Sequence, residues 1–184
     1  MKITVAGTGY VGLVTAVCLA EYGHSVSCVD IDADKINLMK AGVSPIYEPG
    51  LEELMNNNIE RLHFTTDYQS AYKDADVIFI GVGTPEKSDG SANLSYVYGV
   101  AEQIAASIEK DCVVVLKSTV PIGTNDKIES LIKSQLKHNV NVYVASNPEF
   151  LSQGTAVRDT LHTSRIVIGV EEEAAGETLK EVYK

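Results

Sequence analysis

Short apolar segments alternate with longer segments of mixed polarity along the whole chain. The apolar segments are nearly continuous in β-branched and aliphatic residues, a pattern that is typical of strands covered on both faces. This pattern predicts strands at 2–7, 25–30, 76–82, 112–118, 140–146 and 165–170. The intervening segments predict helices at 11–22, 33–41, 51–57, 95–109 and 124–137.

The alternation of strands and helices predicts the α/β fold class, with a doubly wound, mainly parallel sheet and helices on both of its faces. A length of 184 residues fits one domain, residues 1–184. The last segment, 171–184, is expected to be a helix. Because it stops without a C-cap glycine or a polar tail, we expect the chain to be truncated.

Two segments lack clear periodicity. Residues 40–50 contain two prolines, Pro45 and Pro49, and are expected to form an ordered excursion ahead of the next helix. Residues 83–95 form a loop that is long for an α/β connection, and long loops at strand ends often carry function.

Acidic residues outnumber basic ones by 25 to 15, which gives a formal charge of −10. A field of this sign repels nucleic acid and anionic membranes, so neither is expected as a partner. The N-terminus enters a strand pattern without a signal peptide, and no apolar run approaches the length of a membrane span. We therefore expect a cytoplasmic protein.

The cysteines, Cys18, Cys28 and Cys112, lie inside apolar segments. They are expected to be buried, reduced and structural rather than paired in a disulfide or bound to a metal. The four histidines are scattered, and none has metal-ligand spacing to a cysteine or another histidine. No metal site is expected.

The segment GTGYVG, residues 7–12, follows the first predicted strand and opens a helix. Gly7 would permit the tight turn, Gly9 would let a pyrophosphate approach the backbone, and Gly12 would allow close packing of helix and strand. The phosphates would lie at the N-terminus of the helix, against free N–H groups. The loop, including Tyr10 and Val11, is therefore a candidate dinucleotide site of the Rossmann type.

The second predicted strand ends in an acid, Asp30, which lies 18 positions beyond Gly12. A carboxylate there can bind both hydroxyls of an adenosine ribose and would repel a 2′-phosphate, which favours NAD over NADP. Asp32 is the alternative, but it occupies the position of a helix N-cap. Lys35 either reaches the ribose edge or is a solvated helix lysine, and the sequence leaves both possibilities open.

A proline-stiffened turn, NPEFLSQG at 147–154, follows the fifth predicted strand. Turns that only reverse the chain favour glycine, asparagine and aspartate. Here a single carboxylate, Glu149, is followed by an aromatic residue, and an amide follows four positions after Glu149. These side chains indicate a functional turn.

Six motifs occur in one order: GTGYVGL, CVDID, SPIYEPGLEEL, GTP followed by DGSANLSYV, KSTVPIGT and NPEFLSQGTAVRDTL. From residue 3 to about residue 170 the chain resembles the UDP-glucose 6-dehydrogenase family of nucleotide-sugar dehydrogenases. The resemblance implies two Rossmann-type domains joined by a long central helix. This chain would be the N-terminal, NAD-binding domain, without the central helix and the C-terminal UDP-sugar-binding domain.

The resemblance also implies an activity. Members oxidise the C6 alcohol of UDP-glucose twice, with two NAD⁺, and the UDP-glucuronate formed serves polysaccharide biosynthesis. A cysteine forms a thiohemiacetal and then a thioester, but none of the three cysteines here has its glycine-rich setting, so the nucleophile is expected beyond residue 184. The fragment alone is expected to be inactive, and a homodimer is implied for the full-length protein.

The resemblance assigns cofactor contacts to Thr84, Ser118 and Thr119. Thr119 would also hold an attacking water or donate to a developing oxyanion. A simpler alternative is that Ser118 and Thr119 only cap the following helix.

The remaining assignments concern the turn. Glu149 would orient or deprotonate the hydrolytic water, and the backbone of Phe150 and Leu151 would meet the sugar. Gln153 stands where the family commonly has glutamate; it can bind the nicotinamide side but cannot take a proton. Arg165 is expected to be structural, at the start of the last predicted strand.

Two other functions stay open. GDP-mannose 6-dehydrogenases share these motifs. A non-catalytic NAD-sensing module would account for Gln153 and for the absence of a suitable cysteine.

Overall fold

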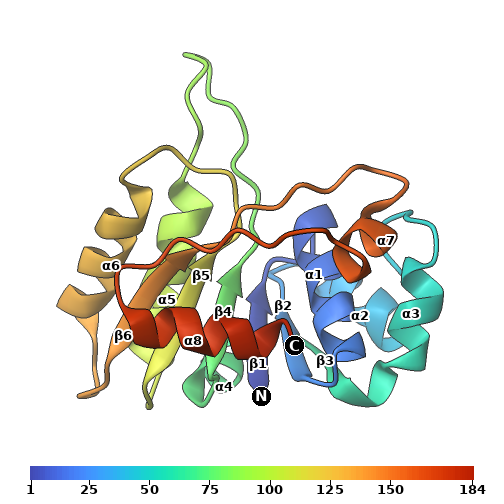
Figure 1. Ribbon diagram of the computed structural model, residues 1–184, viewed down its shortest axis with the longest axis horizontal. Helices are drawn as coiled ribbons and strands as arrows, with labels where there is room; N and C mark the ends of the chain where they lie inside the picture. The colour runs from blue at the N-terminus through green and yellow to red at the C-terminus, as the bar shows by residue number, and fades with distance from the viewer.

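Six parallel strands run through the centre of the computed structural model, which describes residues 1–184 (Figure 1). Their order is β3-β2-β1-β4-β5-β6, and every neighbouring pair is parallel. The chain begins in the middle of the sheet and winds first to one side and then to the other. The expected doubly wound, Rossmann-type fold is therefore confirmed.

The strands are β1 (Lys2–Ala6), β2 (Ser25–Val29), β3 (Leu62–Thr65), β4 (Val77–Ile80), β5 (Cys112–Leu116) and β6 (Val142–Ser146). The helices are α1 (Tyr10–Glu21), α2 (Ala33–Lys40), α3 (Leu51–Asn57), α4 (Tyr68–Lys73), α5 (Ser95–Ser107), α6 (Thr124–Gln135), α7 (Ala156–Leu161) and α8 (Glu173–Val182), with a 3-10 turn at Ile59–Arg61. No helix is both long enough and apolar enough to cross a membrane.

Alternate residues of the strands pack into two cores, one on each face of the sheet. In β4, Val77 and Phe79 belong to one core, whereas Ile78 and Ile80 belong to the other. Residues of α1, α2, α3, α7 and α8 complete the first core, and residues of α4, α5 and α6 complete the second. Burial on both faces explains why the strand segments are nearly continuous in apolar residues.

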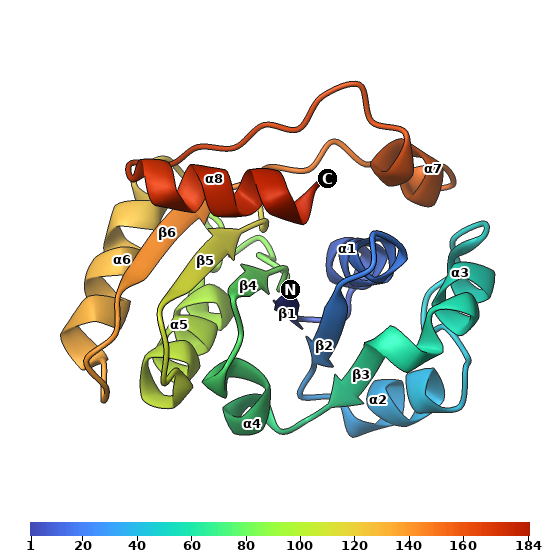
Figure 2. The same cartoon turned by 60° about the horizontal axis from the view of Figure 1, so that its bottom comes forward.

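The last helix lies over the same face of the sheet as α1 (Figure 2). Its buried residues are Ala175, Leu179 and Val182. The ring of His24, just before β2, lies with Nε2 at 2.8 Å from the carbonyl oxygen of Val182. The C-terminal helix thus completes a core that the first residues of the chain begin.

The strand prediction was wrong in two places: one predicted strand does not form, and one strand was missed. Residues 165–170 form no strand: only Ser146 and Gly169 pair, as an isolated antiparallel bridge. This segment crosses the sheet between α7 and α8 instead of running beside β6 (Figure 1). The sixth strand is β3 at the opposite edge, whose four residues bury only alternate side chains and so lack a continuous apolar run.

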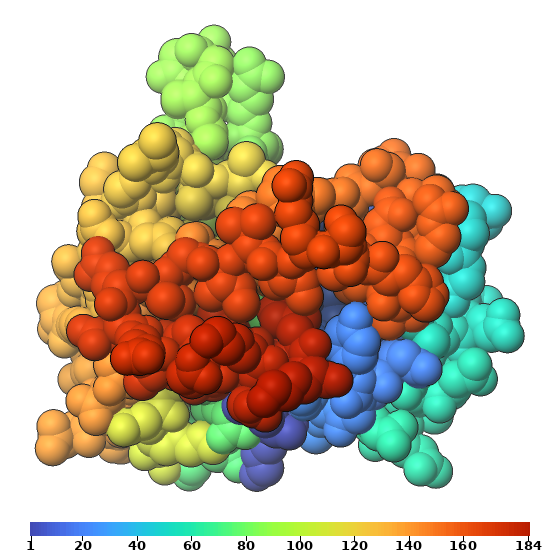
Figure 3. Space-filling model, viewed as in Figure 1, coloured from blue at the N-terminus to red at the C-terminus, as the bar shows by residue number.

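The helix predictions were confirmed to within two residues, including α8 within the expected 171–184. Sequence analysis missed α4 and α7, each of only six residues, which is too short to show helical periodicity. The loop after β4 projects from the body of the molecule (Figure 3). A bridge between Glu86 and Ala92 joins its two arms.

Candidate functional site

The candidate site residues lie along the edge of the sheet that is formed by the carboxyl ends of the strands. Because all the strands are parallel, the residues that follow them emerge on the same side. These are Gly7–Gly12 after β1, Asp30 after β2, Thr84 after β4, Ser118 and Thr119 after β5, and Glu149–Gln153 after β6. Open α/β sheets bind ligands at this edge, where the strand order reverses.

The three glycines of the first loop have different environments. Gly7 has a φ of +93°, a conformation that favours glycine. A Cβ atom on Gly12 would lie 2.0 Å from the carbonyl oxygen of Gly7, so only glycine lets α1 approach the loop this closely. A Cβ atom on Gly9 would meet no heavy atom within 4 Å, which leaves open space at the N-terminus of α1 for a ligand.

Asp30 is bound to the glycine loop. Its Oδ2 accepts hydrogen bonds from the backbone nitrogen (2.8 Å) and the hydroxyl (2.6 Å) of Thr8, and its Oδ1 accepts one from the nitrogen of Asp32 at 3.0 Å. Burial by itself would raise the pKa of Asp30, but these donors and nearby Lys35 bring it below its ordinary value. Asp30 is therefore ionised at neutral pH.

Asp32 is the N-cap of α2, as expected: its Oδ1 accepts from the nitrogens of Asp34 and Lys35 at 3.0 and 3.2 Å. A cleft of about 460 Å³ lies beside the glycine loop. Its lining includes Gly9, Asp30 and Lys35, with an apolar wall that includes Val82 and Tyr96. A carboxylate next to an apolar wall suits an adenosine, because the carboxylate can bind the ribose and the wall can contact the base. Sequence analysis did not identify Tyr96 as part of this site.

Ser118 and Thr119 do not cap a helix, so that alternative was wrong. The N-cap of α6 is Gly123. The hydroxyl of Ser118 instead donates to the carbonyl oxygen of Val82 at 2.6 Å, and the hydroxyl of Thr84 donates to the carbonyl oxygen of Thr119 at 3.0 Å. These bonds join the ends of β4 and β5 and leave the exposed Thr119 side chain free.

A second cleft, of about 470 Å³, lies at the ends of β5 and β6. Its lining includes Ser118, Thr119 and Glu149, so the structure brings these residues together around one space. Gln153 is exposed and lines neither of the two clefts.

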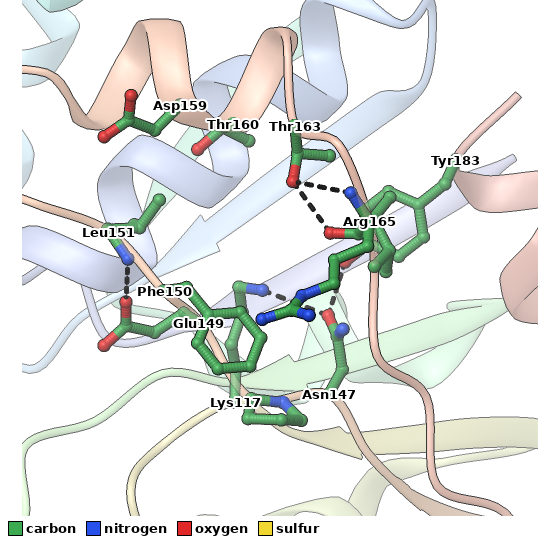
Figure 4. Close-up of a pocket in the computed structure, with 12 residues that line it drawn as sticks. Lys117, Asn147, Glu149, Phe150, Leu151, Asp159, Thr160, Thr163, Arg165 and Tyr183 are labelled. Atoms are coloured by element: carbon green, nitrogen blue, oxygen red, sulfur yellow. Dashed lines mark hydrogen bonds between the residues drawn. The ribbon is translucent and has the colours of Figure 1, made fainter.

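The turn after β6 restrains its own carboxylate (Figure 4). Oε2 of Glu149 accepts a hydrogen bond from the nitrogen of Leu151 at 2.6 Å. The Phe150 ring is exposed, and the Arg165 guanidinium lies over it with its carbon 5.8 Å from the ring centroid. Arg165 was expected to start a strand; it lies instead in a non-strand segment, against the turn, where a cation–π contact is favourable.

A partly buried polar network lies beneath the turn (Figure 4). Nζ of Lys117 donates to Oδ1 of Asn147 at 3.0 Å, and the hydroxyl of Tyr183 donates to the same oxygen at 2.5 Å. Burial lowers the pKa of Lys117 to about 8, although the negative charge of Glu149 acts in the opposite direction. Lys117 is thus a largely buried cation on the core side of the candidate site.

Sequence analysis missed Lys117 and also Glu48, a buried carboxylate. Both had a visible signal. Lys117 is a charge directly after five apolar strand residues, and Glu48 is a lone acid in a segment with proline on either side.

The three cysteines are buried and free, as expected. Burial raises the pKa of each thiol to about 12. A nucleophilic cysteine is accessible and has a depressed pKa, so none of the three fits that role.

Comparison with known proteins identifies the family. Residues 1–184 match the profile of the UDP-glucose/GDP-mannose dehydrogenase family, NAD binding domain. The chain is 56% identical to UDP-glucose 6-dehydrogenase YwqF of Bacillus subtilis, over the whole chain and 42% of that relative. It is 47% identical to UDP-glucose 6-dehydrogenase of Pseudomonas aeruginosa, again over the whole chain and 42% of the relative.

Solved structures show the same similarity. A UDP-glucose dehydrogenase from Pyrobaculum islandicum matches 98% of this chain and 43% of its own, with a TM-score of 0.93 and 40% identity. A GDP-mannose dehydrogenase from Pseudomonas aeruginosa, in a ternary complex, matches 100% of this chain and 44% of its own, with a TM-score of 0.92 and 41% identity. The chain thus spans less than half the length of the relatives that it matches. It belongs to the UDP-glucose/GDP-mannose dehydrogenase family and corresponds to the NAD-binding domain of that family.

Proposed function

We propose that this chain is the NAD-binding half of an enzyme that oxidises UDP-glucose to UDP-glucuronate. The main support is the position of the cleft shared by Thr119 and Glu149, which lies on the same sheet edge as the dinucleotide cleft. The 56% identity to a UDP-glucose 6-dehydrogenase over the whole chain agrees with this substrate.

The first cleft fits NAD. Gly9 and the free N–H groups at the N-terminus of α1 would bind the pyrophosphate, and the ionised Asp30 would accept hydrogen bonds from the adenosine ribose. Lys35 would lie at the ribose edge, and Thr84 and Ser118 toward the nicotinamide. When bound, NAD⁺ supplies a hydride acceptor.

The second cleft would receive the sugar. The free hydroxyl of Thr119 can donate to an oxygen on which negative charge develops, or hold a water. One oxygen of Glu149 is restrained by Leu151, and the other can orient a water and accept its proton. Phe150, Leu151 and Gln153 line neither of the two clefts. The backbone of Phe150 and Leu151 would meet the sugar next to Glu149, and Gln153 would contact the nicotinamide side without transferring a proton.

The cysteine nucleophile would come from the rest of the protein. The relatives are more than twice as long as this chain, and the three cysteines here are buried. We therefore place the thiol, most of the UDP-sugar contacts and the contacts of a homodimer in a second half that would close over the sheet edge.

The test is NADH formation by the full-length protein with UDP-glucose and, separately, with GDP-mannose. We expect UDP-glucose to be oxidised, with two NADH formed per UDP-glucuronate. GDP-mannose is the second candidate, because a GDP-mannose dehydrogenase matches this chain with 41% identity. Preference for GDP-mannose would contradict the proposed substrate, and no oxidation of either sugar nucleotide would favour an NAD-sensing module.

A further inference from the structure

Glu48 is a buried carboxylate in the connection between α2 and α3, with a side chain that reaches two other parts of the molecule. The residue is only 5% exposed. Its Oε2 accepts hydrogen bonds from the Tyr10 hydroxyl at 2.5 Å and from the nitrogen of Gly154 at 2.8 Å. Its Oε1 accepts one from the nitrogen of Ala156 at 2.8 Å.

The partners of Glu48 belong to the two sides of the candidate site. Tyr10 is the first residue of α1 and directly follows Gly9 of the glycine loop. Gly154 ends the turn that contains Glu149, and Ala156 is the first residue of α7. Glu48 therefore joins the cofactor loop to the end of the turn through a single side chain.

Glu48 also replaces a cap that α7 lacks. The hydroxyl of Thr155, the N-cap residue, accepts no hydrogen bond from a backbone N–H of the first turn; it donates instead to Oδ2 of Asp159 at 2.6 Å. The free N–H groups of a helix N-terminus need acceptors, and here the acceptor is 108 residues away in sequence. The hydroxyl of Tyr10 lies 3.4 Å from the carbonyl oxygen of Ser152, which adds a second, weaker contact to the turn.

The pKa shifts of Glu48 and Tyr10 favour a hydrogen bond from the Tyr10 hydroxyl to an ionised Glu48 carboxylate. Burial by itself would raise the pKa of Glu48, but the Tyr10 hydroxyl and the backbone donors lower it below its ordinary value. Burial and Glu48 raise the pKa of Tyr10 to about 12. At neutral pH a carboxylate thus accepts from a protonated hydroxyl, and hydrogen bonds to a charged acceptor are the stronger kind.

We propose that Glu48 is a positioning residue that fixes the glycine loop relative to the turn at 147–154, so that cofactor binding and the conformation of the turn depend on one carboxylate. The inference rests on the proposed function, which assigns the turn to the substrate side. Glu48 acts through Tyr10 and through the amides of Gly154 and Ala156.

The experiment compares NAD⁺ affinity, measured by calorimetry, with hydrogen exchange at the amides of Gly154 and Ala156. The variants are Glu48→Gln, the more conservative Glu48→Asp, Tyr10→Phe and the double variant Glu48→Gln/Tyr10→Phe. Glu52→Gln is the matched control, because Glu52 accepts from the nitrogen of Ser44 within the same region at 2.8 Å.

We expect Glu48→Gln to speed exchange at Gly154 and Ala156 by about tenfold and to weaken NAD⁺ binding roughly three- to tenfold. Glu48→Asp should shift both quantities in the same direction by less, because its carboxylate is one methylene shorter. Tyr10→Phe should weaken NAD⁺ binding, and the double variant should bind no more weakly than Glu48→Gln, since the two residues act as a unit. Glu52→Gln should match the unmodified chain.

Faster exchange in both Glu48 variants with unchanged NAD⁺ affinity would overturn the proposal, because Glu48 would then only stabilise α7. Additive losses in the double variant, or unchanged exchange, would overturn it as well. If Glu48→Gln does not fold, Glu48→Asp decides between the same outcomes. Neither readout requires oxidation of a sugar nucleotide, so failure of this inference is distinguishable from failure of the proposed function.

Discussion

The carboxylate of Asp30 accepts hydrogen bonds from Thr8 of the glycine loop. We expect the same carboxylate to bind the adenosine ribose of NAD. Asp30→Ala should therefore weaken NAD⁺ binding by roughly 1–3 kcal/mol, the range for a hydrogen bond to a charged group. The unmodified chain should bind NADP⁺ poorly, because a 2′-phosphate would meet a like charge. Calorimetry with both cofactors measures these differences, and equal affinities of the unmodified chain for NAD⁺ and NADP⁺ would contradict the assignment.

Lys117 gives the fold a dependence on pH. Burial lowers its folded-state pKa to about 8 from an ordinary 10.5. Between these values the unfolded chain binds a proton that the folded chain does not, so the free energy of unfolding should rise with pH from about 8 to 10.5. Below pH 8 this contribution is constant, and the buried charge lowers stability there.

Lys117→Met should therefore raise the free energy of unfolding at pH 7 by roughly 1–3 kcal/mol, less the lost hydrogen bond to Asn147. It should also flatten the rise above pH 8. Denaturant unfolding at a series of pH values measures both effects. Exposed Lys127 is a control, since Lys127→Met should leave the profile unchanged; the same profile in both variants would be inconsistent with the burial of Lys117.

At the scale of elements, the packing of α1 against the first loop gives Gly9 and Gly12 different roles, although both belong to the same glycine motif. Gly12→Ala should lower the free energy of unfolding by about 1–3 kcal/mol, because its Cβ would overlap a backbone oxygen that cannot yield without moving the helix. Gly9→Ala should keep the melting temperature, because the space around it is empty. It should nevertheless weaken NAD⁺ binding by about tenfold or more, because the Cβ would occupy the path of the pyrophosphate.

Thermal unfolding and calorimetry on the two variants make the comparison. The expected result is a crossed pattern, in which one variant loses mainly stability and the other mainly affinity. Equal loss of stability in both would show that Gly9 is also needed for packing.

The sequence alone was sufficient to predict the strands whose side chains are buried along most of their length. Five strands are buried along most or all of their length and were found from apolar runs alone. β3 was missed because His63 is exposed between Leu62 and Phe64. Residues 165–170 were taken for a strand because they form an apolar run, but most of these apolar side chains are exposed and only Gly169 pairs with a strand. The glycine loop and Asp30 were predictable because their spacing is local. The bond between Glu48 and Ala156 was not, because it depends on how segments 108 residues apart meet.

At the scale of the whole molecule, binding and chemistry should be separable. The chain of 184 residues should bind NAD⁺ but form no NADH from UDP-glucose, because its thiols are buried. Addition of the remaining half of the protein should restore oxidation. NADH formation by this chain alone, insensitive to a thiol-blocking reagent, would contradict the proposal that this half binds NAD⁺ and the other half supplies the cysteine nucleophile.

In the restored enzyme, Glu149→Gln should slow hydrolysis of the thioester more than the first hydride transfer, since the carboxylate is proposed to act on water. Rapid-quench measurement of the two steps distinguishes them. Gln153→Glu is the companion variant and should be tolerated, because Gln153 is exposed and lines neither cleft. Equal slowing of both steps by Glu149→Gln would place the carboxylate in substrate binding instead.

The contact between His24 and Val182 joins residues 158 positions apart and has a consequence for how the protein is made. Folds that depend on such distant pairings form slowly, because a large loop must close before the contact forms. On the ribosome, the face of α1 that packs against α7 stays uncovered until residues 156–161 have emerged, although β1 and its neighbours are complete much earlier. The nascent chain therefore carries an apolar surface from the time when β1 and its neighbours are complete until α7 emerges, and this is the interval in which chaperones would bind it.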